Sequence, residues 1–391
     1  MTSSKLSLMQ ERARAALQNL FVADALAMPV HWYYRVGDIF AAFPNGVSAY
    51  EAPPEWHPSS IMSLHSTAQG GRKASAKAAP DVVGDVILKG RRQHWDRANV
   101  HYHVGMAAGD NTLNAHCARL LMRTLAEAEQ SRGHAEGVEI GSENDGKSQG
   151  SAYSVDDFAA RYIDFMTADV PQHPDTYAES YHRGFFHNYA QGLPPRKCGA
   201  VTHDTASVGG LVTIAPLALQ SLLKGLPLEH VQAQCREHLF LTHPSDELAL
   251  VCDAYVGLIA QLLLGPDGEQ PTNEQLLQSV PARTRKALLA AIEKQAQDAD
   301  VVGRMLSPAC YISDSWPALL YFLCRYRDQP QQALLANTHV GGDNVHRGAV
   351  LGVLLGLLRG QSEQVWFSHL ADAQAIDQEI LQLAACRTDV R

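Results

Sequence analysis

The sequence has no surplus of positive charge: 32 Lys and Arg residues stand against 41 Asp and Glu residues, a formal net charge of −9. Surfaces that bind nucleic acid or anionic membranes need the opposite balance. An apolar run of about 18 residues, the length that a membrane-spanning helix requires, is also absent from the sequence. We therefore expect neither a nucleic-acid partner nor a membrane span.

Paired cysteine motifs are missing as well. The seven cysteines are scattered, odd in number and include no CxxC pair, whereas a disulfide framework normally uses an even, regularly spaced set. The N-terminal stretch "MTSSKLSLMQERARAALQ" lacks the apolar core of a secretory signal peptide. These absences together favour reduced thiols in a cytoplasmic protein.

Alternating strand patterns are hard to find, and helical periodicity dominates instead. Apolar residues recur at three- and four-residue steps in stretches that begin at Met9, Leu113, Leu217 and Leu248, as they do on helices with one buried face. Pro and Gly divide these stretches into pieces of ordinary helix length. The sequence therefore predicts an all-α protein built from many helices.

Two stretches are predicted to be surface excursions. Residues 66–81 are small, polar and basic, and residues 131–154 are rich in Gly, Ser and acidic side chains. Such segments bury too little apolar surface to order themselves, so both are expected to be flexible. Helical patterns resume on either side of each, which predicts one compact domain over residues 1–391.

The most distinctive segment is "THVGGDNVHRGAVLGVLLGLLRGQ", residues 338–361. Glycine recurs every four residues at Gly348, Gly352, Gly356 and Gly360, which forms one bare stripe on a helix where another backbone can approach. Each helical glycine costs about 1 kcal/mol relative to alanine, so four in register predict tight packing. The polar loop before this helix would meet its free N–H groups, either as an N-cap at Asp343 or Asn344 or as a binding site.

Four further polar motifs precede this segment. Asp110 and Asn111 in "GMAAGDNTLNAH" also stand at a helix start, so two helix N-termini are expected to face a common pocket. Asp24 falls inside an apolar helix, which is unfavourable unless the carboxylate is hydrogen-bonded. The remaining two motifs are the loop "HDTASVGG" and the turn "LTHPSDE".

Three histidines, His94, His101 and His103, lie just before the Asp110 loop. Their spacing has no clear period. A pocket wall, with Trp95 or another aromatic residue stacking on a base, is favoured over a metal cluster, and both interpretations stay open.

In this order the motifs resemble those of the ADP-ribosylglycohydrolase family. The matching stretches are "ADALAMPVH", "GDNT", "ASVGGLVTIAP", "LTHP" and "GGDNVHRGAVLGVLLGLLRG". The resemblance covers nearly the whole chain apart from the two surface excursions, and the last motif with its glycine stripe is the most specific. It implies an all-α ADP-ribosylglycohydrolase-like fold.

The resemblance also implies a chemistry. In the family, two Mg²⁺ or Mn²⁺ ions between the two Asp-containing loops hold the ribose hydroxyls of ADP-ribose and a water. Hard ions of this kind prefer oxygen ligands, and a metal pair can orient the ribose and activate the water. The enzyme then hydrolyses the bond at C1″ of ribose through an oxocarbenium-like state.

This sequence departs from the family pattern at several of those positions. Asp110 and Asp343 are kept, but three acidic positions are occupied by Asn111, Val345 and His31. Loss of carboxylates leaves a divalent charge without local neutralisation. The departures predict no Mg²⁺ pair, and at most one divalent cation, Mg²⁺ or Mn²⁺, held by Asp110 and Asp343.

Three interpretations stay open: a divergent hydrolase of an N- or O-ribosyl bond, an inactive member that binds a nucleotide-like ligand or has a structural role, and a fold that holds one metal ion through Asp110 and Asp343 alone. A small ribosyl or nucleotide-like molecule is the expected partner. Five residues of the two Asp loops are expected to converge on one cavity: Asp110, Asn111, Asp343, Asn344 and His346. The candidate catalytic residues are Asp110, Asn111, Asp343 and His346, and the candidate substrate-binding residues are Asp24, His31, Thr112, Ser207, Gly209, Gly210, His243, Gly342 and Asn344.

Overall fold

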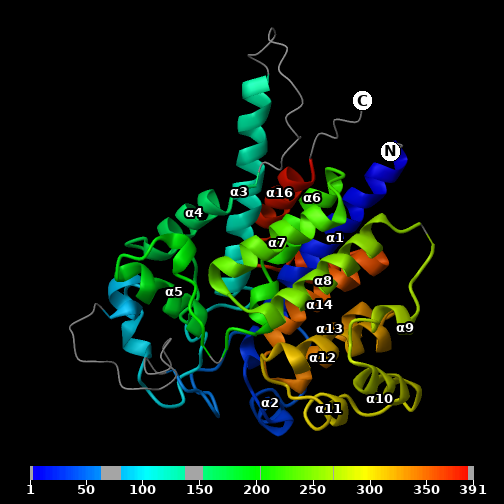
Figure 1. Cartoon of the computed structure of the whole chain (residues 1–391). Coiled ribbons are helices and arrows are strands. Elements are labelled where there is room, and N and C mark those ends of the chain that lie inside the picture. The colour runs from blue at the N-terminus through cyan, green and yellow to red at the C-terminus, as the bar shows by residue number, and fades with distance from the viewer. Residues whose placement is uncertain (1–2, 63–80, 137–152, 203, 267, 386–391) are drawn as a thin grey trace.

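A computed structural model describes residues 3–62, 81–136, 153–202, 204–266 and 268–385, and their regular elements are helices (Figure 1). Within these ranges there is no β-strand, and extended pairing is limited to isolated bridges. The prediction of an all-α fold is therefore confirmed. The α-helices are α1 (Ser3–Ala27), α2 (Val36–Ala42), α3 (Leu113–Glu136), α4 (Val155–Thr167), α5 (Ser180–Ala190), α6 (Ile214–Leu223), α7 (Leu228–Thr242), α8 (Asp246–Leu264), α9 (Asn273–Leu276), α10 (Ala282–Glu293), α11 (Asp298–Val301), α12 (Ile312–Arg325), α13 (Pro330–Val340), α14 (Asn344–Arg359), α15 (Gln364–Phe367) and α16 (Ala373–Ala384). Short helical turns are η1 (Met28–Val30), η2 (Val82–Val86), η3 (Arg92–His94), η4 (Pro195–Lys197) and η5 (Val208–Leu211).

The two segments expected to be flexible fall mostly outside the described residues, at 66–80 and 137–152. Residues 131–136 differ from the expectation, because they complete α3. Of these six residues Arg, Ala and Glu favour helix and Gly133 opposes it, and the helix continues into them from the residues before.

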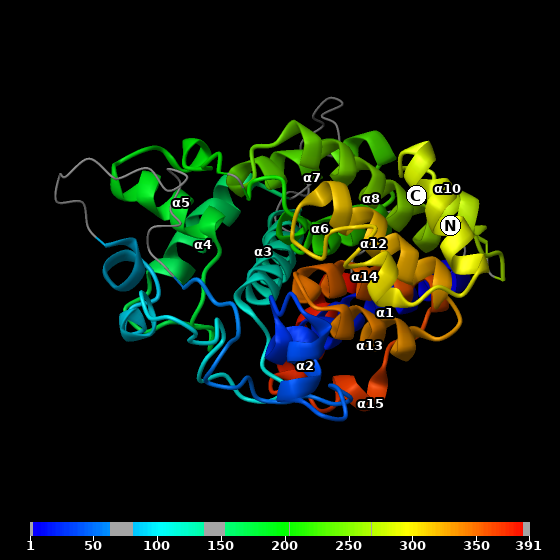
Figure 2. The same ribbon diagram turned by 90° about the horizontal axis from the view of Figure 1, so that it is seen from below.

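Helices α1 and α14 lie side by side through the middle of the molecule (Figures 1 and 2). The glycine stripe explains how close they come. A Cβ on Gly352 would lie 2.4 Å from the carbonyl oxygen of Asn19, and one on Gly356 would lie 2.5 Å from that of Ala15. Real side chains cannot occupy those positions, so the predicted tight packing is confirmed, and the partner backbone is α1.

The apolar helix α8 packs against α6, α7 and α14 in the core. By length and composition alone α8 could cross a membrane, and 56% of its apolar window is buried inside the fold. A core helix of a globular protein gives the same pattern.

The arrangement brings four distant segments to one place. The C-terminal end of α1 with η1, the N-terminus of α3, the loop before α5 and the N-terminus of α14 all contribute buried polar side chains there. In both views α4 and α5 lie on one side of the α1–α14 pair and α10 lies on the other (Figures 1 and 2).

Candidate functional site

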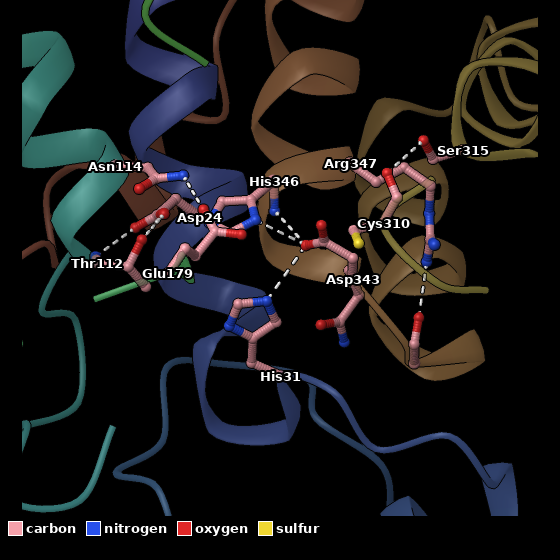
Figure 3. A network of polar contacts seen from close by, with 12 residues as sticks. Asp24, His31, Thr112, Asn114, Glu179, Cys310, Ser315, Asp343, His346 and Arg347 are labelled. Carbon is pink, nitrogen blue, oxygen red and sulfur yellow. Dashed lines mark hydrogen bonds and ion pairs between the residues drawn. The ribbon is translucent and has the colours of Figure 1, made fainter. Parts of the chain in front are cut away.

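Asp343 is the N-cap of α14 and the centre of a buried polar cluster (Figure 3). Its Oδ1 accepts a hydrogen bond from the backbone N–H of His346 at 3.3 Å. The same oxygen lies 3.2 Å from Nε2 of His31 and 2.8 Å from Nδ1 of His346. The 2.8 Å contact is an ion pair. Its geometry is not that of a hydrogen bond, and Nδ1 of His346 has no hydrogen-bond partner. One carboxylate thus joins histidines from opposite ends of the chain.

The other ring nitrogen of His346 faces Glu179, with 3.7 Å between Nε2 and Oε2. Glu179 precedes α5, and its Oε2 accepts a hydrogen bond from Nδ2 of Asn114 on α3 at 2.7 Å. A Cβ on Gly209 would lie 2.8 Å from that same oxygen. Because Gly209 has no Cβ, there is space for the Glu179 carboxyl.

The charges of these three groups support one another. Burial alone would lower the pKa of His346, but attraction to Asp343 and Glu179 raises it to about 10. Burial alone would raise the pKa of Asp343, yet the adjacent His346 charge and the hydrogen bond from His31 lower it. Burial raises the pKa of Glu179 to about 7, against the attraction of His346. Near neutral pH, an imidazolium at His346 therefore lies between an ionised Asp343 and a carboxyl that can hold a proton.

A second buried carboxylate, Asp175, extends the cluster on the far side of His31. Nδ1 of His31 lies 2.7 Å from Nε2 of His103, and Nδ1 of His103 lies 2.8 Å from Oδ1 of Asp175. The other oxygen of Asp175 accepts the backbone N–H of Leu113 at 2.8 Å, in the first turn of α3. The result is a continuous buried chain from the start of α3 to the start of α14.

The number of protons in this chain follows from its contacts. Burial would raise the pKa of Asp175, but His103 lowers it, so both end carboxylates are ionised. Three contacts join Asp175, His103, His31 and Asp343, and each needs one proton. Burial lowers the pKa of His31 to about 3.

Asp24 ties the first Asp loop to α1. Its Oδ1 accepts from Nδ2 of Asn111 and from the backbone N–H of Thr112, both at 2.8 Å, and its Oδ2 accepts from the Thr112 hydroxyl at 2.6 Å. Burial raises the pKa of Asp24, although the Thr112 and Asn111 hydrogen bonds oppose the shift. The buried Asp24 carboxylate is thus hydrogen-bonded, as expected, and both of its oxygens accept hydrogen bonds.

Asp110 does not join the cluster in this geometry. Its Oδ2 accepts the backbone N–H of Ala107 at 2.8 Å, within its own loop. Among the described residues, the group that brings metal-capable atoms within 4.8 Å of one another consists of His31, Asp343 and His346. Asp110 is not part of this group, and one metal ion held by Asp110 and Asp343 stays a prediction.

Gly342 and Asn344 flank Asp343 and shape the backbone around it. Gly342 has a φ of 66°, and a Cβ there would lie 1.9 Å from the carbonyl oxygen of Pro308. Nδ2 of Asn344 donates to the carbonyls of Thr338 and Val30. These contacts fix the loop, while the roles in substrate binding assigned to both residues stay predictions.

A cavity of about 10 Å³, room for about one water molecule, lies against the cluster. Of the five residues expected to converge on one cavity, His346 is in its wall, and Asp343 lies directly behind His346. The wall consists of His31, Trp32, His103, Thr112, Leu113, Asn114, Asp175, Tyr177, Glu179 and His346.

The predicted glycine loop and His243 border a second cavity of about 20 Å³, which Gly209 and Gly210 help to line. A Cβ on Gly210 would lie 3.0 Å from Cγ of His243. The Ser207 hydroxyl is buried next to this loop without a hydrogen-bond partner. Gly209 also borders the first cluster, through the Glu179 carboxyl.

Sequence reasoning missed Glu179 and Asp175. Both lie in "DTYAES", a short acidic loop before α5 that carries no distinctive spacing. The one available signal was an acidic residue just before a helix start, and it also fits an ordinary helix terminus. His103 is one of the three histidines that precede the Asp110 loop, and it lies in the wall of the first cavity.

The cluster does not fit the Mg²⁺ or Mn²⁺ pair that the resemblance implies. Mg²⁺ takes oxygen ligands in octahedral geometry, whereas this cluster offers two imidazoles and one carboxylate. The Asp110 carboxylate accepts a hydrogen bond from the backbone of Ala107, and the Asp24 carboxylate accepts two from Thr112. Val345 offers no side-chain ligand.

Comparison with known proteins agrees with the motif pattern. Residues 6–389 match the profile of a family described as ADP-ribosylglycohydrolase. A solved structure titled "ADP-ribosylglycohydrolase-related protein complex" superposes with a TM-score of 0.54 over 97% of this chain and 98% of that chain, at 17% sequence identity. No curated protein matches by sequence. At 17% identity the structural match establishes the fold.

Proposed function

Because this chain belongs to the ADP-ribosylglycohydrolase family, we propose that it hydrolyses an N- or O-ribosyl bond in an ADP-ribosyl or related ribosyl substrate. The observation that carries the proposal is the arrangement of Glu179 and Asp343 on opposite sides of His346, beside a small cavity. Hydrolysis of a glycosidic bond uses two carboxyl groups in different protonation states.

Glu179 is the proposed general acid. The Glu179 carboxyl faces the cavity and is held by the amide of Asn114, and burial raises its pKa to about 7. It gives its proton to the leaving oxygen or nitrogen as the bond to C1″ breaks. The cavity has room for about one water, which adds to C1″ and returns a proton to Glu179.

Asp343 is the proposed electrostatic partner. It stays ionised beside His346 and His31, so it favours the positive charge that develops on the ribose as the leaving group departs. His346 carries charge between the two carboxylates and orients both. The Mg²⁺ or Mn²⁺ pair is no part of this proposal, because the residues present do not fit it.

The test is a panel of N-linked and O-linked substrates. Peptides with ADP-ribose on arginine, on serine and on a carboxylate are incubated with the full chain, and released ADP-ribose is measured by chromatography. Release from any one of them above the no-enzyme rate supports the proposal. Intact substrate throughout contradicts it.

A second candidate function follows from the size of the cavity. A space of about 10 Å³ cannot admit a ribose unless its walls open, which also fits a family member that binds a nucleotide-like ligand or is structural. Thermal shift with ADP-ribose separates the two. A shift without hydrolysis supports a binding protein, and hydrolysis rules out the inactive alternatives.

A further inference from the structure

We propose that His31, Asp343 and His346 form a site for one divalent transition-metal ion of the Zn²⁺ class. Such a site differs in ligands and metal type from the oxygen-rich pair that the family resemblance implies. It does not depend on the proposed hydrolysis, because metal binding is measured without a substrate. The three residues come from the end of η1 and the first turn of α14, and Figure 3 shows them pointing toward one another.

The spacing of the ligand atoms suits a small tetrahedral ion. Bonds of about 2.0–2.1 Å to Zn²⁺ separate neighbouring ligand atoms by about 3.3 Å. Asp343 Oδ1 lies 3.2 Å from His31 Nε2 and 2.8 Å from His346 Nδ1. All three ligand atoms lie within 4.8 Å of one another, so small side-chain shifts would complete the geometry.

Two atoms beside the proposed ion lack a hydrogen-bond partner. Oδ2 of Asp343 and Nδ1 of His346 are buried and have no hydrogen-bond partner. Burying a polar atom without a partner costs about 1–3 kcal/mol, and buried groups of this kind call for an explanation. A metal ion bound by His31, Asp343 and His346 supplies the partner that Nδ1 of His346 lacks.

The outer contacts match those of histidine metal sites. A histidine ligand usually donates its second ring N–H to a carboxylate or another acceptor, which fixes the ring. His31 has His103 in that position at 2.7 Å, with Asp175 behind His103 at 2.8 Å. His346 has Glu179 in that position at 3.7 Å. The His31 ring is therefore oriented by a hydrogen-bonded partner on the side away from the proposed ion, and the other ring nitrogen of His346 faces a carboxyl group.

Ion binding leaves the charge of the cluster unchanged. Without an ion, a proton between His31 and Asp343 and a proton on His346 Nδ1 occupy the position of the metal. Ligation requires both nitrogens to be unprotonated, so two protons leave as one divalent ion enters. The buried carboxylates then face the same total positive charge in both states, and a fourth coordination position is left for water from the cavity.

The ligand set points to the metal class. Two imidazoles and one carboxylate with an open position are typical of Zn²⁺ and related transition-metal ions, whereas Mg²⁺ takes oxygen ligands. Affinity for such a site rises along the first-row series toward Cu²⁺ and Zn²⁺. Zn²⁺ is the probe for affinity, and Co²⁺ is the probe for geometry.

The experiment uses the full chain, stripped of metal with a chelator and dialysed. Zn²⁺ is titrated by calorimetry in two buffers of different ionisation enthalpy, and Co²⁺ by visible absorption. The expected result is one ion per chain, release of about two protons, visible d–d bands of a four- or five-coordinate site, and no comparable binding of Mg²⁺.

Variants then locate the site. His31→Gln is expected to abolish the Co²⁺ bands, and His103→Gln, one shell further out, to weaken Zn²⁺ binding by roughly 10–100-fold. His369→Gln, at an exposed histidine, is the control and is expected to bind as wild type does. Far-ultraviolet circular dichroism checks that each variant is folded.

Two results would overturn the proposal. One is wild-type protein that gives no Co²⁺ bands and no stoichiometric Zn²⁺ binding, which needs no variant to interpret. The other is Zn²⁺ binding that survives unchanged in folded His31→Gln and His103→Gln and is lost in His369→Gln, which would mark a surface site. Neither result bears on the hydrolysis of ribosyl substrates, which is measured separately.

Discussion

Nδ1 of His346 lies 2.8 Å from Oδ1 of Asp343, and both side chains are buried. The pairing places a positive charge at the start of α14, where the helix dipole disfavours it, so the neighbouring carboxylates must stabilise it. The electrostatics of the site therefore depend on the charge of this pair.

Removing the His346 charge is expected to destabilise the fold. His346→Gln leaves the Asp343 carboxylate buried without its main counter-charge, and breaking a buried pair on one side costs roughly 3–5 kcal/mol. Urea unfolding followed by circular dichroism measures the loss. The double variant His346→Gln with Asp343→Asn removes both charges and should recover part of it. If the single variant unfolds like wild type, the pair does not carry charge.

The α1–α14 contact predicts opposite effects for two glycine substitutions. Gly356→Ala places a methyl group 2.5 Å from the Ala15 carbonyl oxygen, and overpacking of this kind costs about 1–3 kcal/mol or more. Gly257→Ala on α8 meets nothing within 4 Å and should stabilise the protein by about 0.5–1 kcal/mol. Melting temperatures of the two variants, measured side by side, should move in opposite directions. A common direction would contradict the packing described.

Buried neutral histidines predict loss of stability in acid. Burial lowers the pKa of His238 to about 3, and its ring bonds to the Tyr153 hydroxyl and the Thr213 hydroxyl. Between pH 6.5 and about 3 the unfolded chain holds a proton there that the folded chain lacks. The contribution of His238 to the free energy of unfolding is therefore complete above pH 6.5. Below that pH it falls by up to about 1.4 kcal/mol per pH unit.

His238→Gln tests that pH dependence. The variant removes one titrating group, so its unfolding free energy between pH 6 and pH 4 should fall less steeply than that of wild type. His369→Gln, on the surface, is the matched control and should keep the wild-type slope. Equal slopes for all three proteins would mean that His238 does not stay neutral in the fold.

Much of this fold could be predicted from local patterns, and part of the site could not. The glycine stripe of α14 and the Asp343 cap follow from spacing along one helix, which is information that a sequence contains. Glu179 and Asp175 enter the site because the residues around the start of α5 meet the first turn of α3, through Asn114 and the backbone N–H of Leu113, a tertiary relationship with no local signature. Likewise, nothing in "GDNT" reveals that the Asp110 carboxylate turns back to Ala107. Sequence patterns identify loops, whereas the direction of each side chain depends on what packs around it.

The central claim is that Glu179 supplies the proton for cleavage of a ribosyl bond. The most direct measurement compares kcat of wild type, Glu179→Gln and Glu293→Gln on whichever ADP-ribosylated peptide the wild type cleaves. Glu293 is an exposed residue of α10, and its variant controls for loss of a carboxylate elsewhere. Loss of a general acid typically lowers the rate by about 10²–10⁴-fold, and this is the result expected for Glu179→Gln, with Glu293→Gln equal to wild type. A Glu179→Gln protein that is folded and cleaves at the wild-type rate would contradict the account.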